Sequence, residues 1–316
     1  MDVSIIIINY NTFELSKNAI ESIFQHTQNL AYEIILVDNA SPDGSGEKLK
    51  EYFGDKIVYI QSGGNLGTSK AFNLGVKNAT GKYVLWLNSD ILLVDNFIKT
   101  LKDYMDEHSE CGICGGNVVD FKGNPAHSFR RKLPTAKTVR QDRSVIRFAF
   151  RKLFKKCINS EYNYTDKPMS VGYITGADMM TRKELLDRLG GFDERIFMYA
   201  EETEFTHRVK NAGYTVVCVP NAKIKHLEGS SFSGKAKFSE KRCRWIIQGI
   251  ARYMFIAYEK KECENYLKVM ARSPGRIAYK IANLKNKDAL LIEATKRKIA
   301  REFLIEIKNG KSIFDL

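Results

Sequence analysis

Four short apolar runs alternate with three helical patterns in the first 90 residues, and this alternation limits the possible folds more than any other feature. The apolar runs are residues 3–9, 34–37, 57–61 and 83–87, and the helical patterns are residues 12–25, 47–53 and 69–79. Apolar, β-branched runs without polar alternation are typical of strands that are buried on both faces. Strands that alternate with helices pair in parallel, and the helices cover the sheet. We therefore predict an α/β fold with a mainly parallel central sheet.

Polar side chains follow three of the predicted strands at the point where each strand ends. They are Tyr10, Asn11 and Thr12 after the first strand, Asp38 and Asn39 after the second, and Asn88, Ser89 and Asp90 after the fourth. In open parallel sheets, ligands bind in the crevice at the carboxyl ends of the strands. We expect these side chains to lie together and to bind a ligand.

The turns after the predicted strands argue against two large classes of nucleotide-binding enzyme. Residues 10–15 contain no glycine, so they cannot form the tight pyrophosphate turn of a dinucleotide-binding dehydrogenase. The chain has no Walker A sequence, which excludes a P-loop enzyme. The glycine-rich residues 63–67 precede a helix and, taken alone, are typical of a plain turn.

The net charge of +13 is distributed unevenly along the chain. Residues 122–156 carry 12 Lys and Arg against one acid, and residues 235–316 carry 20 against 9, whereas the rest carries 18 against 27. An acidic body suits metal binding, and basic segments suit phosphates, anionic lipid surfaces or nucleic acid. The acids of the candidate site, and the lack of a zinc finger or RNP motif, argue against nucleic acid.

The cysteines and the apolar runs predict a cytoplasmic protein. The six Cys are scattered without a disulfide framework, and Cys111 and Cys114 lie in a predicted strand, where core packing is expected rather than zinc binding. No apolar run approaches the ~20 residues that span a bilayer. Residues 1–8 lack the positive patch and the length of a signal peptide.

Three carboxylates, Glu201, Glu202 and Glu204, directly follow an aromatic stretch that ends at Tyr199. One interpretation is a solvated helix N-terminus, where the helix dipole favours acids. The other is a partly desolvated carboxylate whose raised pKa lets it act as a general base. The residues alone leave both interpretations open.

Asp90 and His226 each end a predicted strand, and both are candidate metal ligands. A carboxylate in such a place can cap a helix, or it can be a hard oxygen ligand for Mg²⁺ or Mn²⁺ that bridges to a diphosphate. A single His is usually structural, although a neutral imidazole is a competent metal ligand.

A series of motifs follows in a fixed order along residues 3–260. They are VSIIIINYN (3–11), VDNASPDGS (37–45), NLG (65–67 and 73–75), LNSD (87–90), GGFDE (190–194), YAEETE (199–204) and His226. No single motif is specific, but the series resembles the family 2 inverting glycosyltransferases with the GT-A fold, in particular the rhamnosyltransferase-like branch of bacterial polysaccharide synthesis. The resemblance implies a GT-A nucleotide-sugar-binding fold with a C-terminal helical extension.

The resemblance also implies a role for each matching residue. The nucleotide-binding residues would be Asn9, Tyr10, Asn11, Asp38, Asn65, Gly67, Asn73, Asn88, Ser89 and Asp90. Asp90 and His226 would bind Mg²⁺ or Mn²⁺. Glu202 would be the catalytic base, preceded by the acid Glu201, and the acceptor would contact Asp193 and Tyr199.

The implied domains are a GT-A catalytic domain over residues 1–238 and a basic helical region over residues 239–316. The nucleotide-binding half of the catalytic domain would cover about residues 1–120, and the acceptor half about residues 121–238. Within the basic region, residues 239–260 are expected to pack an apolar face on the catalytic domain. Beyond them, basic residues alternate with apolar ones, which is typical of a helix on an anionic membrane surface. We therefore expect peripheral binding to the inner face of the cell membrane.

Two positions depart from the family pattern. Asn88 stands in place of the first acid of the Asp-x-Asp motif, as in many members of this branch, so metal binding would rest on Asp90. Glu202 stands where most members have Asp, and its additional methylene moves the carboxylate by ~1.5 Å. Either the site accommodates this shift, or Glu201 takes the role of the base.

The implied reaction moves a sugar from dTDP-rhamnose or a UDP-sugar to a hydroxyl of a glycan or lipid-linked acceptor, with inversion. One alternative is a nucleotidyltransferase-like enzyme, but that class should carry a glycine- and arginine-rich loop after the first strand. Another is a nucleotide-sugar-binding protein without catalysis. A third is a family member that acts on protein or small molecules.

Overall fold

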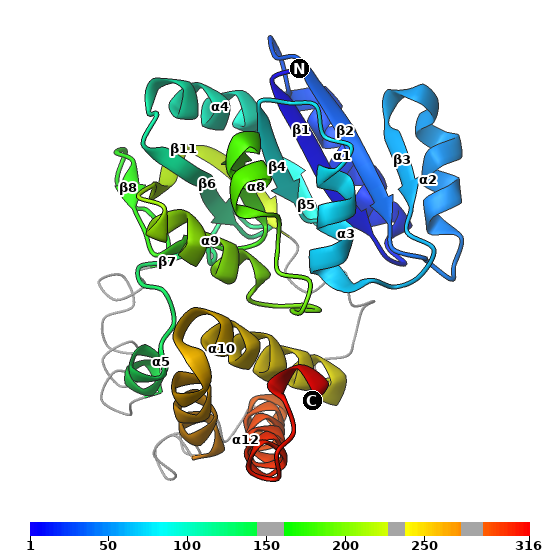
Figure 1. The fold of residues 1–316 in the computed structure, drawn as a ribbon. Helices are drawn as coiled ribbons and strands as arrows, with labels where there is room; N and C mark the ends of the chain where they lie inside the picture. Colours follow the sequence, from blue (N-terminus) through cyan, green and yellow to red (C-terminus); the bar gives the residue numbers. More distant parts are fainter. Residues whose placement is uncertain (144–160, 227–237, 273–286) are drawn as a thin grey trace.

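The computed structural model describes residues 1–143, 161–226, 238–272 and 287–316, and a curled sheet of nine strands lies at its centre (Figure 1). The strand order is β3-β2-β1-β4-β10-β6-β11-β5, with β8 paired to β11. The strands are β1 (Val3–Asn9), β2 (Tyr32–Asp38), β3 (Val58–Gln61), β4 (Tyr83–Leu87), β5 (Ile91–Leu93), β6 (Cys111–Val119), β8 (Met169–Ser170), β10 (Asp178–Arg182) and β11 (Thr215–His226). β7 (Phe129–Arg130) and β9 (Tyr173–Ile174) form a separate pair.

The four N-terminal strands confirm the predicted parallel arrangement. β1 pairs in parallel with β2 and β4, and β2 pairs in parallel with β3. Ile5 and Ile7 pack in one apolar core, and Ile6 packs in a second core on the opposite face of the sheet. Because both faces of β1 are buried, its sequence shows no polar alternation.

Helices cover both faces of this sheet, as the alternating pattern predicts. They are α1 (Phe13–His26), α2 (Ser45–Phe53), α3 (Gly67–Val76), α4 (Phe97–Glu107), α8 (Lys183–Leu189) and α9 (Glu201–Asn211). Ile20 of α1 and Leu101 of α4 belong to the first core. Phe72 of α3 and Phe205 of α9 belong to the second.

The C-terminal residues form a separate helical layer with its own core, below the sheet in Figure 1. Its elements are α10 (Glu240–Ala271), α12 (Lys287–Lys308) and the short helix η2 (Ile313–Asp315), together with α5 (Ala136–Asp142). α10 is interrupted at Glu259, whose φ is 68°. Ile247 and Met254 of α10 are buried in this core, which agrees with the predicted packing role of residues 239–260.

The structure differs from the sequence prediction along residues 214–226. The apolar runs at residues 214–219 and 222–226 predict two strands, whereas the structure has the single strand β11. Pro220 lacks a backbone N–H, and the pairing of β11 with β6 shifts register between Cys218 and Lys223. The proline therefore interrupts the pairing without ending the strand.

Cys111, Cys114, Cys218, Cys243 and Cys263 are free and buried, which confirms that the C-x-x-C pair belongs to the core. Cys157, the basic residues 144–156, and residues 281–285 of the predicted interfacial helix lie outside the described residues. None of the helices in the described ranges combines the length and the apolar character needed to cross a membrane.

Candidate functional site

Asn9 ties the carboxyl end of β1 to the loop after β2. Its side-chain nitrogen lies 2.8 Å from Asp38 Oδ1, 3.0 Å from Ser41 Oγ and 2.8 Å from Ser45 Oγ. Its side-chain oxygen accepts a hydrogen bond of 2.9 Å from the Thr12 hydroxyl. The side chain is buried and engaged on both polar atoms. Asn9 therefore holds the end of β1 and the loop after β2 in a fixed relative position.

Asp38 is buried at the end of β2, next to β1. Its Oδ2 accepts hydrogen bonds from the Ser41 backbone N–H at 3.1 Å and from Gln61 Nε2 at 3.0 Å. A Cβ atom at Gly46 would lie 2.2 Å from Asp38 Cγ, so glycine is needed there for α2 to approach the carboxylate. These contacts hold the carboxylate in one orientation.

Tyr10 and Asn11 form the turn that leaves β1. Tyr10 is exposed over 41% of its surface, so its ring is available at the strand end. Asn11 has a φ of 56° and its side-chain oxygen accepts a hydrogen bond from the Asp43 backbone. Ser89 is buried and lies 3.4 Å from the Thr12 hydroxyl, which brings the end of β4 to the end of β1. The structure thus gathers the predicted residues of all three strand ends.

Asp90 and His226 meet although 136 positions separate them in the sequence. The backbone N–H of Asn88 donates to Ala177, which fixes the chain as it leaves β4. β5 then runs antiparallel to β11 with Ile91 opposite His226, and this register places Asp90 beside the imidazole. His226 Nε2 lies 3.0 Å from Asp90 Oδ1, and Asp90 is buried.

The Asp90–His226 pair fits a divalent cation with two protein ligands. A carboxylate oxygen and an imidazole nitrogen are both ordinary ligands of such ions. Within the described ranges, no cluster of three or more His, Cys, Asp or Glu could hold a metal.

α9 begins at the acidic pair Glu201 and Glu202, after a turn in which Tyr199 and Ala200 have φ values of 67° and 74°. Glu201 is buried, and its Oε2 has no hydrogen-bond partner among the described residues. Burial raises the pKa of Glu201 well above its ordinary value, and the Glu202 charge raises it further. The structure thus supports the desolvated interpretation for Glu201 over a solvated helix end.

Glu202, the next residue of α9, is half-buried. Burial raises its pKa, whereas hydrogen bonds from the helix backbone and from the Thr203 hydroxyl oppose that rise in part. Tyr173 of β9 lies nearby, and burial together with the Glu202 charge raises the pKa of Tyr173 to about 12. Sequence analysis missed Tyr173, because no motif marks the two-residue strand that carries it. The third acid, Glu204, is paired with Arg208 and takes no part.

The loop before α9 is clamped to α3 by residues predicted to line the nucleotide pocket. Asn73 donates to the Phe192 carbonyl and accepts from the Phe192 N–H, both at 2.8 Å. A Cβ at Gly67 would lie 2.4 Å from the Phe197 carbonyl oxygen, so glycine allows this close approach. The side-chain oxygen of Asn65 accepts hydrogen bonds from Asn39 and from the Gly67 N–H. Asn73 therefore holds the loop and does not join the strand-end residues.

The predicted acceptor residues Asp193 and Tyr199 lie on this same loop. Asp193 forms an ion pair of 2.6 Å with Arg195. The Tyr199 hydroxyl accepts a hydrogen bond of 3.0 Å from Arg242 Nε of α10. The loop therefore lies between the sheet domain and the C-terminal helices.

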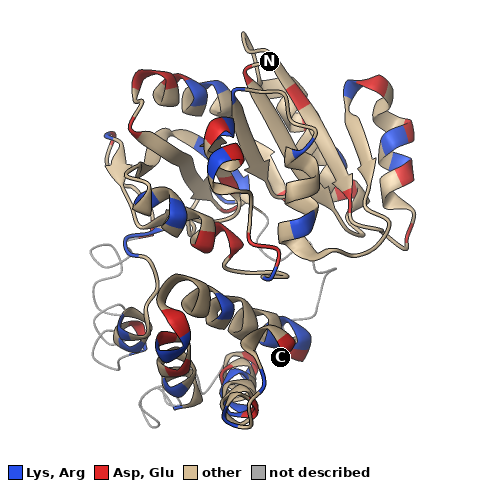
Figure 2. Cartoon of the chain, in the orientation of Figure 1, with Lys and Arg blue, Asp and Glu red and all other residues tan. Residues whose placement is uncertain are grey.

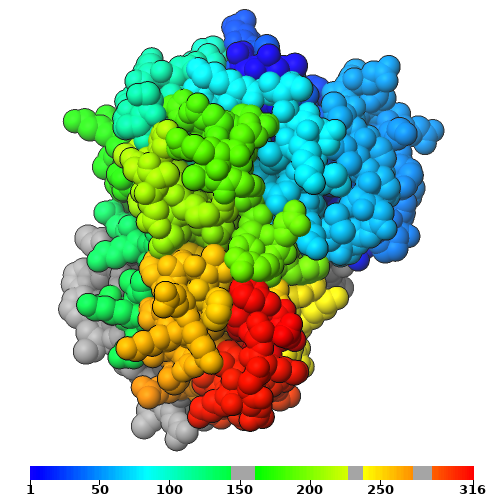
Figure 3. All heavy atoms as spheres, viewed as in Figure 1, coloured from blue at the N-terminus to red at the C-terminus, as the bar shows by residue number. Residues whose placement is uncertain are grey.

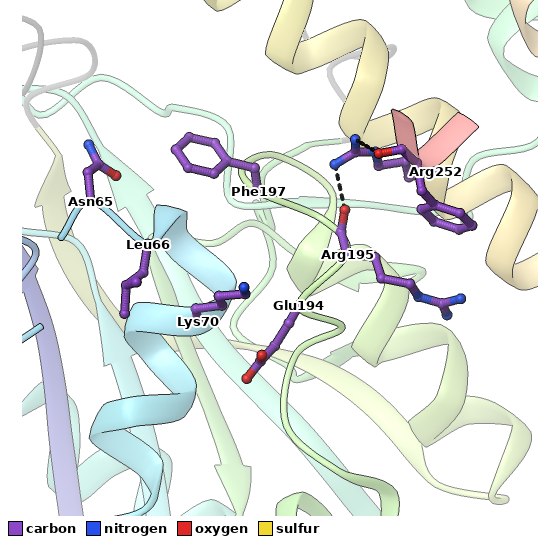
Figure 4. A pocket seen from close by; sticks show the side chains of 8 residues that line it. Asn65, Leu66, Lys70, Glu194, Arg195, Phe197 and Arg252 are labelled. Atoms are coloured by element: carbon purple, nitrogen blue, oxygen red, sulfur yellow. Dashed lines mark hydrogen bonds between the residues drawn. The ribbon is translucent and has the colours of Figure 1, made fainter. Parts of the chain in front are cut away.

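A pocket of about 410 Å³ opens beside this loop (Figure 4). Its lining residues are Asn65, Leu66, Lys70, Glu194, Arg195, Phe197, Arg252 and Phe314. Arg252 donates to the backbone carbonyl of Arg195 at 2.6 Å and to that of Phe314 at 2.9 Å. The C-terminal residues thus lie against the loop, as the red and green surfaces of Figure 3 show. Of the residues predicted from sequence, Asn65 lines this pocket.

Comparisons with known proteins identify matching families over most of the chain. The family model of glycosyl transferase family 2 matches residues 4–190, and that of glycosyl transferase family 21 matches residues 141–261. The N-acetylglucosaminyl-diphospho-decaprenol L-rhamnosyltransferase of Mycobacterium tuberculosis is 24% identical over 212 residues, which cover 63% of this chain and 67% of that protein. The low-salt glycan biosynthesis hexosyltransferase Agl10 of Haloferax volcanii is 28% identical over 221 residues, or 68% of this chain and 64% of Agl10.

Solved structures show the same fold at low sequence identity. GalNAc-T7 with UDP, GalNAc and Mn²⁺ has a TM-score of 0.60 at 16% identity, over 99% of this chain and 58% of that one. TarS 1–349 of S. aureus has a TM-score of 0.51 at 16% identity, over 98% of this chain and 92% of that one. These neighbours share the GT-A fold with this chain, which confirms the fold expected from the sequence.

Proposed function

The chain belongs to glycosyl transferase family 2 and is a glycosyltransferase of glycan or polysaccharide biosynthesis, and from that premise we propose its reaction. It transfers a sugar from a nucleoside-diphosphate sugar to a hydroxyl of a glycan or lipid-linked acceptor, with inversion at the anomeric carbon. The contact between Asp90 and His226 at the strand ends carries this proposal. It supports a site for a divalent cation and a diphosphate near the end of β1, where Tyr10 is exposed.

The proposed donor is dTDP-rhamnose, and UDP-sugars are the second choice. The similarity to a rhamnosyltransferase supports this order, as does the series of motifs in the sequence. Tyr10, Asn11 and Asp38 would face the nucleoside, and Asn65 and Gly67 would shape the loop beside it. In this proposal Asn9 and Asn73 act by holding those elements in place.

Asp90 and His226 would hold Mg²⁺ or Mn²⁺, which supplies positive charge to stabilise the leaving diphosphate. Asn88 and Ser89, which precede Asp90, would contact the nucleotide.

Glu202 accepts the proton of the acceptor hydroxyl. As that proton leaves, the hydroxyl oxygen forms a bond to the anomeric carbon, and the bond from that carbon to the diphosphate oxygen breaks on the opposite face. The raised pKa of Glu202 makes its carboxylate a stronger base than an exposed glutamate. Burial, and in addition the Glu202 charge, raise the pKa of Glu201 and so favour its protonated form.

The acceptor would approach along the loop before α9, where Asp193 and Tyr199 lie. In this arrangement, residues 1–238 form the catalytic domain, with the nucleotide in the half up to about residue 120. Residues 239–316 form the helical region that supports the acceptor loop from below. The hydrogen bond from Arg252 to the Arg195 carbonyl supports this role of the helical region.

A donor panel tests the proposal. Release of the nucleoside diphosphate is measured for dTDP-rhamnose and several UDP-sugars, with Mn²⁺ and with excess chelator. We expect turnover with dTDP-rhamnose that requires the cation. Asp90→Asn and Glu202→Gln should each lower the rate by roughly 10²-fold or more, while Asp55→Asn, an exposed acid far from the site, should not.

Undiminished turnover in chelator, or in Asp90→Asn, would refute the cation site. If Glu201→Gln abolishes turnover while Glu202→Gln does not, then Glu201 is the base. Far-ultraviolet circular dichroism of each variant shows that the loss does not come from unfolding.

A further inference from the structure

α12 presents one exposed stripe to solvent along its whole length. Its exposed residues recur at every third or fourth position: Lys287, Leu291, Ala294, Lys298, Arg301, Ile305 and Lys308. At about 100° per residue, these positions fall within an arc of about 100° on the helix. The opposite arc is buried and holds Ile299, Phe303 and Ile307. We call the exposed set the basic–apolar stripe.

The basic–apolar stripe carries four cations and no acid. Three of the four acids of α12 are paired with basic residues from outside the stripe, and the fourth, Asp288, adjoins Lys287 at the start of the helix. These pairs are Glu293 with Arg143, Glu302 with Arg244 and Glu306 with Lys311. The flanking acids are therefore largely neutralised by other residues, although Glu302 also approaches Lys298 at 3.9 Å. The stripe is locally positive, and Lys and Arg mark α12 in Figure 2.

Two large apolar side chains are exposed within the stripe, near its two ends. Leu291 is 48% exposed and Ile305 is 59% exposed. They are 14 residues apart, or about 21 Å along the helix axis. This spacing suits contact with an extended surface, and a small ligand could not cover both.

We propose that the basic–apolar stripe of α12 docks on an anionic phospholipid membrane, and this docking stands apart from the proposed transfer reaction. The four cations attract anionic headgroups, and Leu291 and Ile305 gain by entering the boundary with the acyl chains. A soluble polyanion would satisfy the cations but leave both apolar side chains in water. A second copy in stripe-to-stripe contact would place four cations against four cations. α12 lies on the far side of α10 from the sheet, so docking leaves the sheet domain clear of the bilayer (Figure 1).

Vesicle sedimentation tests this docking without any donor or acceptor. The full chain is mixed with vesicles of phosphatidylcholine alone, or of phosphatidylcholine with phosphatidylglycerol, at low and high salt. We expect binding to the anionic vesicles that falls at high salt. Lys298→Gln with Lys308→Gln should weaken that binding by roughly thirtyfold. Leu291→Ser with Ile305→Ser should weaken it by at least tenfold.

The matched control is Lys48→Gln with Lys56→Gln, which removes the same charge from exposed positions outside α12. Equal binding to neutral and anionic vesicles would overturn the proposal, as would equal loss in the control and the stripe variant. If inorganic polyphosphate binds as tightly as the vesicles and the serine variant still binds both, the stripe recognises a soluble polyanion instead. If the serine variant converts a dimer to a monomer in analytical ultracentrifugation, the stripe is an interface between copies.

Failure of docking and failure of the transfer reaction are distinguishable. The stripe variants should release nucleoside diphosphate from a soluble donor at the unmodified rate, because α12 contributes no residue to the candidate site.

Discussion

At the scale of single residues, Asp178 has a buried carboxyl of which only one oxygen has a hydrogen-bond partner among the described residues. Asp178 is buried at the start of β10, and its Oδ2 accepts a hydrogen bond of 2.6 Å from the Gly116 N–H. Its Oδ1 has no hydrogen-bond partner in the described part of the chain. Burial raises the pKa of Asp178 well above its ordinary value, and burial also raises the pKa of the neighbouring Cys218 thiol. The folded protein therefore favours the protonated form of this carboxyl.

The raised pKa of Asp178 predicts how the free energy of unfolding depends on pH. The folded pKa of Asp178 lies above the unfolded one, so its contribution is complete below about pH 4 and is lost as the pH rises toward the folded pKa. Asp178→Asn removes this titration, so we expect its stability relative to the natural chain to increase as the pH rises from 4 to 8. Urea unfolding at the two pH values measures this. An equal effect at both values would contradict the assignment.

At the scale of elements, Gly67 joins the start of α3 to the loop that leads into the acidic pair. Its φ is 76°, and an added Cβ would lie 2.4 Å from the Phe197 carbonyl oxygen. Gly63 has a similar φ of 74°, but an added Cβ there would meet nothing within 4 Å. A substitution at either glycine would cause the same backbone strain, but only a substitution at Gly67 would also cause a steric clash. The two positions therefore form a matched pair.

We expect Gly63→Ala to cost about 1 kcal/mol, from backbone strain alone. Gly67→Ala should cost about 2–3 kcal/mol and should also lower turnover, because the loop must move away from α3. Thermal unfolding and donor turnover of both variants check this. If the two variants lose the same stability and the same turnover, the loop contact is unimportant.

Elements also show where sequence reasoning succeeds and where it fails. The strands of the first 90 residues could be predicted because burial on both faces leaves an unbroken apolar run. β11 could not be predicted as one strand, because Pro220 is usually a strand breaker and its tolerance depends on the neighbouring strand. The pairing of Asp90 with His226 was expected from the family resemblance, and the register of β5 on β11 supplies its physical cause.

At the scale of the whole molecule, the apolar face of residues 239–260 predicts packing on the catalytic domain, but the sequence does not predict the polar contacts of Arg252. Arg252 donates hydrogen bonds to the carbonyls of Arg195 and Phe314, which come from distant segments, and it is one of the eight residues that line the pocket beside the acceptor loop. Its apolar neighbours in the sequence place this arginine in a packed helix. They do not indicate which carbonyl groups accept its hydrogen bonds. The exposed stripe of α12, in contrast, can be derived from the helical spacing of its residues once the buried face is known.

The central claim is that the Asp90–His226 end of the sheet and Glu202 together carry out an inverting transfer. The most direct test is proton NMR of the product made from the donor that the panel selects, which gives the anomeric configuration of the new bond. We predict the configuration opposite to that of the donor. Formation of a bond with the donor's own configuration would contradict the account, because a single displacement with Glu202 as base cannot retain it.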